Sequence, residues 1–213
     1  WAYSTIELVP VNFLIDRHVT TYFSRLLQVA NVPVLTGFTD LKPKADDVEA
    51  MSQLPAILTL PDGRPRLLVH PGSRSEFRLW PAENFASVLD TIVAQNIASV
   101  TLIAGSNERH LVDAIAQGMT QAVARIDDSL SVPQLAALLA QFDVLLCRDS
   151  GPMHVASAVS TQVVALFGAQ GSVVFAPLGE GHGLLSPPIP CVNCVSPETC
   201  VKGDTYRMRC VQN

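Results

Sequence analysis

The sequence is poor in charged residues and contains no run of basic ones. Charged side chains make up 15% of the 213 residues, and 14 basic against 19 acidic residues give a formal net charge of −5. Binding to nucleic acid depends on clustered Lys and Arg side chains that neutralise phosphates, so the composition excludes nucleic acid as the main partner. The sequence also has no apolar run of membrane-spanning length and no signal peptide, and we therefore expect a cytoplasmic protein.

Three motifs that would identify common enzyme classes are absent from the sequence. It has no GxGxxG after the first predicted strand and no GxxxxGK[ST], which argues against a dinucleotide-dependent oxidoreductase and a P-loop enzyme. It has no GxSxG nucleophile elbow, which argues against a hydrolase with a catalytic triad. Any nucleotide site in this chain must therefore use other loops.

Cysteine is scarce and unevenly placed. Four of the five cysteines lie in the last 23 residues, with the spacing C-x2-C-x5-C-x9-C, which does not resemble a secreted disulfide scaffold. Four thiolates so spaced could enclose a structural zinc or iron ion, although the spacing is not a standard zinc-finger form and unpaired surface thiols are the alternative. The candidate ligands are Cys191, Cys194, Cys200 and Cys210. Cys147 lies in a predicted strand and is expected in the core.

Hydrophobic residues make up 48% of the chain, enough for a sizeable core, and their pattern predicts a parallel sheet. Short apolar runs, each followed by a loop with glycine or serine, alternate with helical patterns, as in a sheet covered on both faces. The predicted strands are Arg66 to His70, Val100 to Ala104, Val144 to Cys147, Gln162 to Phe167 and a weaker run, Ala122 to Ile126. The predicted helices are Ala82 to Gln95, Glu108 to Gly118, Val132 to Gln141 and Met153 to Val159. We predict an α/β fold with a doubly wound, Rossmann-like parallel sheet.

Three regions are expected along the chain. Residues 1–63 are interpreted as the end of a preceding domain and a linker, with an amphipathic helix over Asp16 to Ala30 and a linker or covering segment over Pro43 to Gly63. Residues 64–185 form the Rossmann-like domain, and residues 186–213 a Cys-rich tail. Because the chain begins at Trp1 and stops shortly after the cysteines, we expect a piece of a longer protein.

The most informative stretch is the turn after the third long strand, DSGP. Ser150 and Gly151 stand where the next helix begins, and unpaired backbone N–H groups with the positive end of the helix dipole suit such a turn to an anion. Ser150 could cap the helix or donate to a phosphate oxygen, and Gly151 would let a ligand approach the backbone. His154 lies on the same helical face. The alternative is an ordinary capped turn with a surface histidine.

Other polar residues follow neighbouring strands and are expected at the same sheet edge, where ligands of open parallel sheets bind. Ser73 and Arg74 follow the first strand, and Arg78 could hold a phosphate or be a solvated surface charge. Glu108 could accept hydrogen bonds from a ribose diol or merely stabilise a helix dipole. Asp149 would repel a phosphate, so we assign it to ordering the loop, orienting His154 or accepting from a sugar hydroxyl.

The segments RLLVHPGSRSEFRLWPAENFASVL, VTLIAGSNERHL and CRDSGPMHVASAVSTQVVALFGAQGS, together with the late cysteines, resemble glycosyltransferase family 9. That family contains the ADP-heptose heptosyltransferases of lipopolysaccharide core and relatives that act on autotransporter proteins. The resemblance implies the GT-B fold, with this chain as the second, donor-binding half. It also implies a cytoplasmic enzyme at the inner membrane surface, with an ADP-sugar donor and a glycolipid or protein acceptor.

The resemblance further implies roles for single residues. Ser150, Gly151 and His154 would face the donor diphosphate and sugar, Glu108 would match the ribose-binding acid, and the adenine would lie near the backbone of Ser129 to Leu130. Arg78 replaces the lysine that the family usually has before W-P. Inverting transfer without a cofactor is implied, with the catalytic base in a preceding domain, so we expect weak donor binding and no turnover by this chain alone. The alternatives are a GT-B nucleotide-sugar epimerase and a non-catalytic nucleotide-sugar-binding module.

Overall fold

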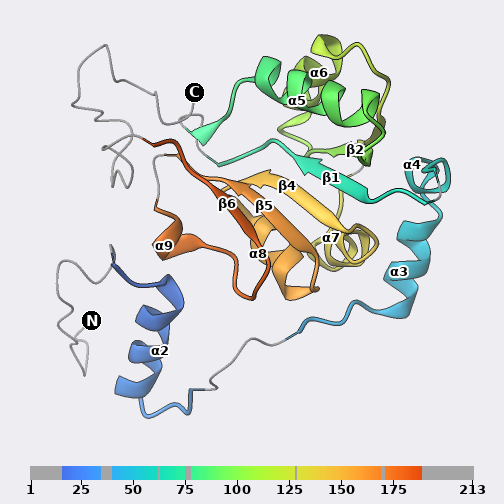
Figure 1. Cartoon of the computed structure of the whole chain (residues 1–213). Coiled ribbons are helices and arrows are strands. Elements are labelled where there is room, and N and C mark those ends of the chain that lie inside the picture. The colour runs from blue at the N-terminus through green and yellow to red at the C-terminus, as the bar shows by residue number, and fades with distance from the viewer. Residues whose placement is uncertain are drawn as a thin grey trace.

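The structure, a computed structural model, describes residues 16–34, 40–61, 63–74, 78–127, 129–168 and 171–188. Within these ranges a single six-stranded parallel sheet runs in the order β3-β2-β1-β4-β5-β6 (Figure 1). Its strands are β1 (Arg66–His70), β2 (Ser99–Ile103), β3 (Ala124–Ile126), β4 (Val144–Arg148), β5 (Gln162–Leu166) and β6 (Gly183–Leu185). The predicted parallel α/β sheet is thereby confirmed.

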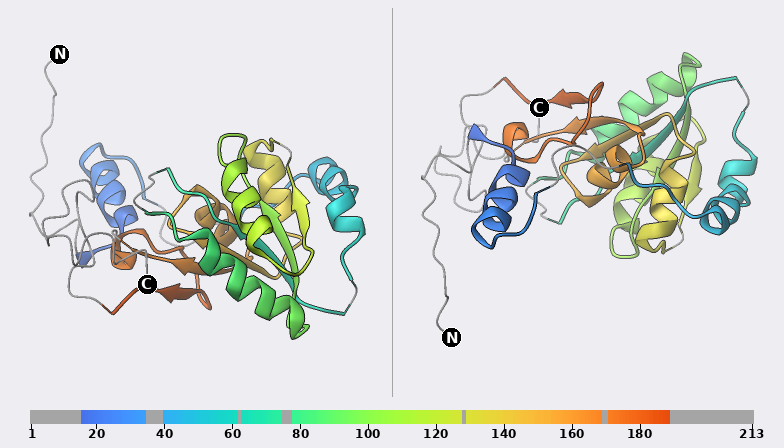
Figure 2. Two further views of the ribbon diagram at one scale, coloured as in Figure 1. Left: turned by 90° about the horizontal axis from the view of Figure 1, so that it is seen from above. Right: turned by 90° about the horizontal axis from the view of Figure 1, so that it is seen from below.

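Helices cover both faces of the sheet, as Figure 2 shows from above and below. Side chains of a strand alternate between its faces, so Leu68 joins one hydrophobic cluster while its neighbours Leu67 and Val69 join the other. The second cluster is closed by α5 (Ala82–Ala94) and α6 (Arg109–Gly118). The first is closed by α3 (Ala45–Ser52), α4 (Pro55–Leu58), α7 (Val132–Leu139) and α8 (Gly151–Ala158). This is the predicted doubly wound, Rossmann-like arrangement.

The segment before β1 packs against the core of the sheet domain. Three of its Pro and Asp residues lie at helix starts: Asp46 and Asp47 occupy the first turn of α3, and Pro55 opens α4. Each helix places one apolar side chain, Met51 or Ile57, in the core. The structure supports the covering interpretation of Pro43 to Gly63, and the assignment of residues 1–63 to a preceding domain and linker stays a prediction.

Several element bounds differ from prediction for local reasons. β6 was missed because it has only three residues in a stretch rich in glycine and proline. α8 begins at Gly151, before the predicted start near Met153, because Pro152 fits the first turn of a helix. α2 (Val19–Val29) forms as predicted, but its expected apolar face is not buried among the described residues, and Phe23 is 56% exposed. α9 (Ser172–Phe175) follows β5.

An apolar cavity of about 490 Å³ lies between α5 and strands β4 to β6, and Arg148 at the end of β4 is among its lining residues. Trp80, which packs edge-on against Phe85 with ring centroids 4.8 Å apart, forms part of its wall, as expected for a packing residue. Leu146, Val164 and Leu185 form much of the rest. In the ranges that the structure describes, no helix combines the length and apolarity that crossing a bilayer requires.

Two adjacent residues of α4 test whether this segment is part of the folded core. Ile57 is 6% exposed and Leu58 is 64% exposed. We expect Ile57→Ala to lower the free energy of unfolding by about 2–4 kcal/mol, because truncating a buried aliphatic side chain leaves a cavity. Leu58→Ala should change it by less than about 0.5 kcal/mol. Urea denaturation of both variants checks this, and equal effects would show that α4 is not docked.

Candidate functional site

The site begins at the point where the sheet reverses its winding. From β1 the chain moves to β2 and β3 on one side, and from β4 it moves to β5 and β6 on the other, so the loops after β1 and β4 part at their carboxyl ends. The two strands are direct neighbours, with His70 level with Cys147. The loops that carry Ser73 and Ser150 therefore start side by side.

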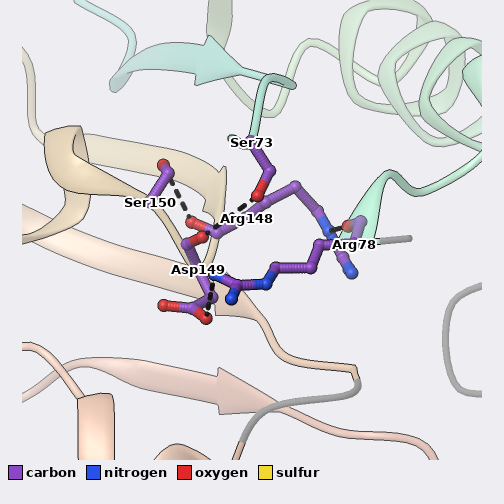
Figure 3. A network of polar contacts seen from close by, with 5 residues as sticks. All are labelled: Ser73, Arg78, Arg148, Asp149 and Ser150. Atoms are coloured by element: carbon purple, nitrogen blue, oxygen red, sulfur yellow. Dashed lines mark hydrogen bonds and ion pairs between the residues drawn. The ribbon is translucent and has the colours of Figure 1, made fainter. Parts of the chain in front are cut away.

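The hydroxyls of Ser73 and Ser150 both reach the backbone at the end of β4 (Figure 3). Ser73 Oγ donates to the carbonyl oxygen of Asp149 at 3.4 Å, and Ser150 Oγ donates to that of Arg148 at 3.1 Å. Ser150 is the N-cap residue of α8, but its side chain makes no capping hydrogen bond, so it does not perform that alternative role. The structure thus brings the two predicted serines to one small area at the start of α8.

Two arginines and Asp149 join the same area. Arg78 Nη1 lies 3.3 Å from Asp149 Oδ2, and Arg148 Nε donates to the backbone carbonyl oxygen of Arg78 (Figure 3). Arg78 is thus an ion-pair partner of Asp149, and not the solvated surface charge of the alternative interpretation. Burial raises the pKa of Asp149, and the positive charges of Arg78, His154 and Arg148 oppose that shift.

Arg148 is a site residue that the sequence analysis missed. It is only 2% exposed, and a buried guanidinium needs partners. The available signal was a charged residue ending an otherwise apolar strand, but its contact with Arg78 could not be found from spacing. Cys147, one residue earlier, is fully buried as expected, and burial raises the pKa of its thiol.

The start of α8 is open to approach from outside. A Cβ built on Gly151 would meet nothing within 4 Å, which leaves space beside the backbone there. His154 follows on the same helix and is exposed, with its ring close enough to Asp149 to interact electrostatically. Partial desolvation lowers the pKa of His154, while the Asp149 carboxylate acts in the opposite direction.

A second polar cluster joins the ends of β1 and β2. Glu108 Oε2 lies 3.4 Å from Nε2 of His70, which is 7% exposed. A Cβ added to Gly72 would overlap the Glu108 carboxylate, so this glycine leaves the space that the carboxylate occupies. The contact with His70 lowers the pKa of Glu108, and burial opposes the shift. Glu108 is the N-cap residue of α6, yet its side chain makes no capping hydrogen bond.

A hollow of about 450 Å³ lies between the loops after β1 and β2. Its walls include Ser73 and Arg74 from the loop after β1 and Glu108 from the loop after β2. Arg74 is exposed at its rim. Leu130 follows β3 further along the same edge and is half-buried against the core, whereas the preceding Ser129 is exposed. His70 and Gly72 were not assigned to the site from sequence, because their partner Glu108 follows a different strand.

The predicted metal ligands Cys191, Cys194, Cys200 and Cys210 lie outside the described residues, so that interpretation stays a prediction without structural support. Across the described ranges, no group of three or more His, Cys, Asp or Glu side chains is arranged to hold a metal ion.

Gly72 and Glu108 should be energetically coupled. We expect Gly72→Ala to push the carboxylate off His70 and lower the free energy of unfolding by about 1 kcal/mol, the size of a lost hydrogen bond. In a Glu108→Ala background the same change should cost much less, because the overlap is gone. Gly151→Ala is the matched control and should be near neutral in stability. Additive effects of Gly72→Ala and Glu108→Ala in chemical denaturation would contradict this packing.

The lowered pKa of Glu108 predicts that the stability of the fold depends on pH. A carboxyl whose pKa is lower in the folded than in the unfolded state stabilises the fold above its unfolded pKa, about 4.3, and loses that contribution as the pH falls through the lower folded value. We expect Glu108→Gln to unfold more easily than the parent chain at pH 7, with the difference shrinking toward zero below about pH 4. Urea titrations at pH 7, 5 and 3.5 test this. A difference that stays constant with pH would refute it.

Comparison with known proteins supports the fold and identifies the family of the chain. The family model described as glycosyltransferase family 9 (heptosyltransferase) matches residues 11–203. Lipopolysaccharide heptosyltransferase 3 of Escherichia coli is 31% identical over 118 residues, which make up 54% of this chain and 34% of that protein.

Two solved structures share the fold. A family 9 glycosyl transferase from Veillonella parvula has a TM-score of 0.71 at 21% identity, with 79% of this chain and 49% of that chain covered. The E. coli ADP-heptose lps heptosyltransferase II has a TM-score of 0.62 at 20% identity, with 78% and 50% covered. The chain thus spans about a third of the curated relative and half of the two solved chains. With the family model matching most of its length, the chain belongs to glycosyltransferase family 9.

Proposed function

We propose that this chain is the donor-binding half of a GT-B heptosyltransferase that transfers a heptose from ADP-heptose to a glycolipid acceptor of the lipopolysaccharide core, with inversion. Membership of the heptosyltransferase family supports the reaction class. The donor is suggested by a structural relative whose description names ADP-heptose. The observation that carries the proposal for this chain is the order of its loops along the sheet edge.

The strand order β3-β2-β1-β4 places four loops in a row at the carboxyl edge. Going along that row, the loops carry Leu130, then Glu108, then Ser73, then Ser150. Neighbouring strands are about 4.8 Å apart, so the row is roughly 14 Å long, comparable to a nucleoside diphosphate. The chemical order of ADP matches it: adenine at Ser129 and Leu130, ribose at Glu108, and diphosphate between Ser73 and Ser150.

The end of the row proposed for the diphosphate has groups that can donate hydrogen bonds to phosphate oxygens. The serine hydroxyls currently donate to backbone carbonyl oxygens and can turn to phosphate oxygens instead. The open start of α8 at Gly151 adds a backbone N–H and the positive end of the helix dipole. Arg78 contributes a guanidinium, and Arg74 stands at the rim of the adjoining hollow.

The negative charge of Asp149 limits where a diphosphate can bind. Its carboxylate is paired with Arg78 at 3.3 Å, so the guanidinium offsets the negative charge of the buried acid. This arrangement lets an anion bind near Asp149 without direct repulsion between two bare negative groups. His154, exposed on α8 near Asp149, is placed to contact the heptose or the second phosphate.

In the proposed reaction, a deprotonated acceptor hydroxyl attacks the anomeric carbon of the heptose. The bond to the diphosphate breaks, and ADP leaves with the electron pair. Donors at Ser73, Gly151 and Arg78 offset the charge that develops on the leaving phosphate. We assign the general base and the acceptor site to the part of the relatives' length that this chain does not span.

Calorimetric titration of the chain with ADP, UDP and GDP tests the donor assignment. We expect ADP to bind, and Arg78→Met to weaken ADP binding about tenfold or more, because a charge-assisted hydrogen bond contributes about 1.5–3 kcal/mol. Lys44→Met, which removes an exposed charge at the start of α3, is the matched control and should bind ADP normally. Preference for UDP or GDP would refute the ADP assignment. No heat with any nucleotide at millimolar concentration would refute the nucleotide site altogether.

A further inference from the structure

His70 occupies an unusual place for a polar residue: the last position of a central, buried strand. It is 7% exposed and is level with the fully buried Cys147 of β4. Alternation along β1 puts its side chain on the same face as Leu68, which belongs to the core cluster under α7 and α8. A polar ring buried there needs a partner to offset its lost hydration.

That partner is Glu108, from the loop after the neighbouring strand. Nε2 of His70 lies 3.4 Å from Glu108 Oε2, whereas its Nδ1 is buried without a hydrogen-bond partner among the described residues. A carboxylate can only accept, so Nε2 must carry the proton that faces it. Leaving the lone pair of Nδ1 unfilled costs less than leaving an N–H without an acceptor.

The carboxylate is held from more than one direction. Gly72 leaves just the space that the carboxylate occupies, because a Cβ there would overlap it. A backbone hydrogen bond from Gly105 also acts on the carboxylate and helps to lower the pKa of Glu108. The Gly105 carbonyl oxygen accepts separately from the Glu108 backbone N–H at 2.9 Å. A glutamate side chain has several freely rotating bonds, and these contacts select one arrangement before any ligand arrives.

We propose that His70 is a positioning residue: through Nε2 it fixes the Glu108 carboxylate so that it can accept hydrogen bonds from the two ribose hydroxyls of the donor nucleotide. The inference rests on the function proposed above and adds a residue that touches the nucleotide only through Glu108. His70 then controls how well the site distinguishes a ribose from a sugar without these hydroxyls, and leaves diphosphate binding unaffected.

The test compares ADP with 2′,3′-dideoxyadenosine diphosphate, which lacks both hydroxyls. For each variant the quantity of interest is the ratio of the two dissociation constants, since both ligands titrate the same folded molecules and a change in folded fraction cancels. We expect the parent chain to bind ADP about tenfold more tightly than the dideoxy analogue, the factor that lost hydrogen bonds to a charged group produce. Glu108→Ala sets the lower limit of this ratio, near one.

His70→Met keeps the volume but removes the donor, and should lower the ratio from about tenfold to roughly two- or threefold while affinity for the dideoxy analogue stays the same. His70→Gln carries an amide N–H at a similar reach and should restore most of the discrimination. His182→Met is the control, because His182 accepts from the Val163 backbone N–H at 3.2 Å in a purely structural contact near β6. It should leave the ratio at the parent value.

The outcomes separate the two proposals. An unchanged ratio in His70→Met, with the parent chain discriminating normally, would overturn the role of His70 and leave the proposed function intact. An equal loss of affinity for both nucleotides would identify His70 as structural, which also overturns the inference. A parent chain that binds neither nucleotide would overturn the proposed function and the inference with it.

Discussion

The pairing of β1 with β4 is the constraint on which the rest of the site depends. The chain leaves β1 toward one side of the sheet and leaves β4 toward the other. The loops that follow these two adjacent strands therefore diverge at the carboxyl edge of the sheet. The groups of the proposed diphosphate site lie in the loops that follow these two strands. Ser73 and Arg78 come from one, Asp149 and Ser150 from the other, and three hydrogen bonds cross between the two loops or lie within the second.

The second organising feature is the way the site manages negative charge. It contains two carboxylates in a region proposed to take up a diphosphate, and each has its own partner: Asp149 pairs with Arg78, and Glu108 contacts Nε2 of His70. The pKa values of the two carboxyl groups are shifted in opposite directions. Burial is the largest cause at Asp149 and raises its pKa, whereas the contact with His70 is the largest cause at Glu108 and lowers its pKa. In the proposed function, Glu108 accordingly accepts from hydroxyl groups, while Arg78 provides positive charge for the phosphates.

The sequence predicted the sheet and the edge of the site but not its internal contacts. Apolar runs and helical periodicity are local signals, and they correctly indicated five strands and the serine-bearing turns at one edge. β6 was too short to produce such a signal, and α8 starts earlier than predicted because Pro152 suits a first turn. The contacts of Arg148 with Arg78 and of His70 with Glu108 join residues of different loops. Spacing within one segment carries no information about such pairs.

The central position of β1 also has a consequence for how the chain acquires its native state. β1 and β2 are close in sequence, but β1 can pair with β4 only after the whole of β2, β3 and their helices has been produced. Pairing two strands that are far apart in the sequence requires closing a long loop, which costs conformational entropy, so such pairs form slowly. A nascent or refolding molecule therefore assembles the proposed nucleotide site only when these two strands pair, and a ligand that binds both strand ends would stabilise the folded conformation.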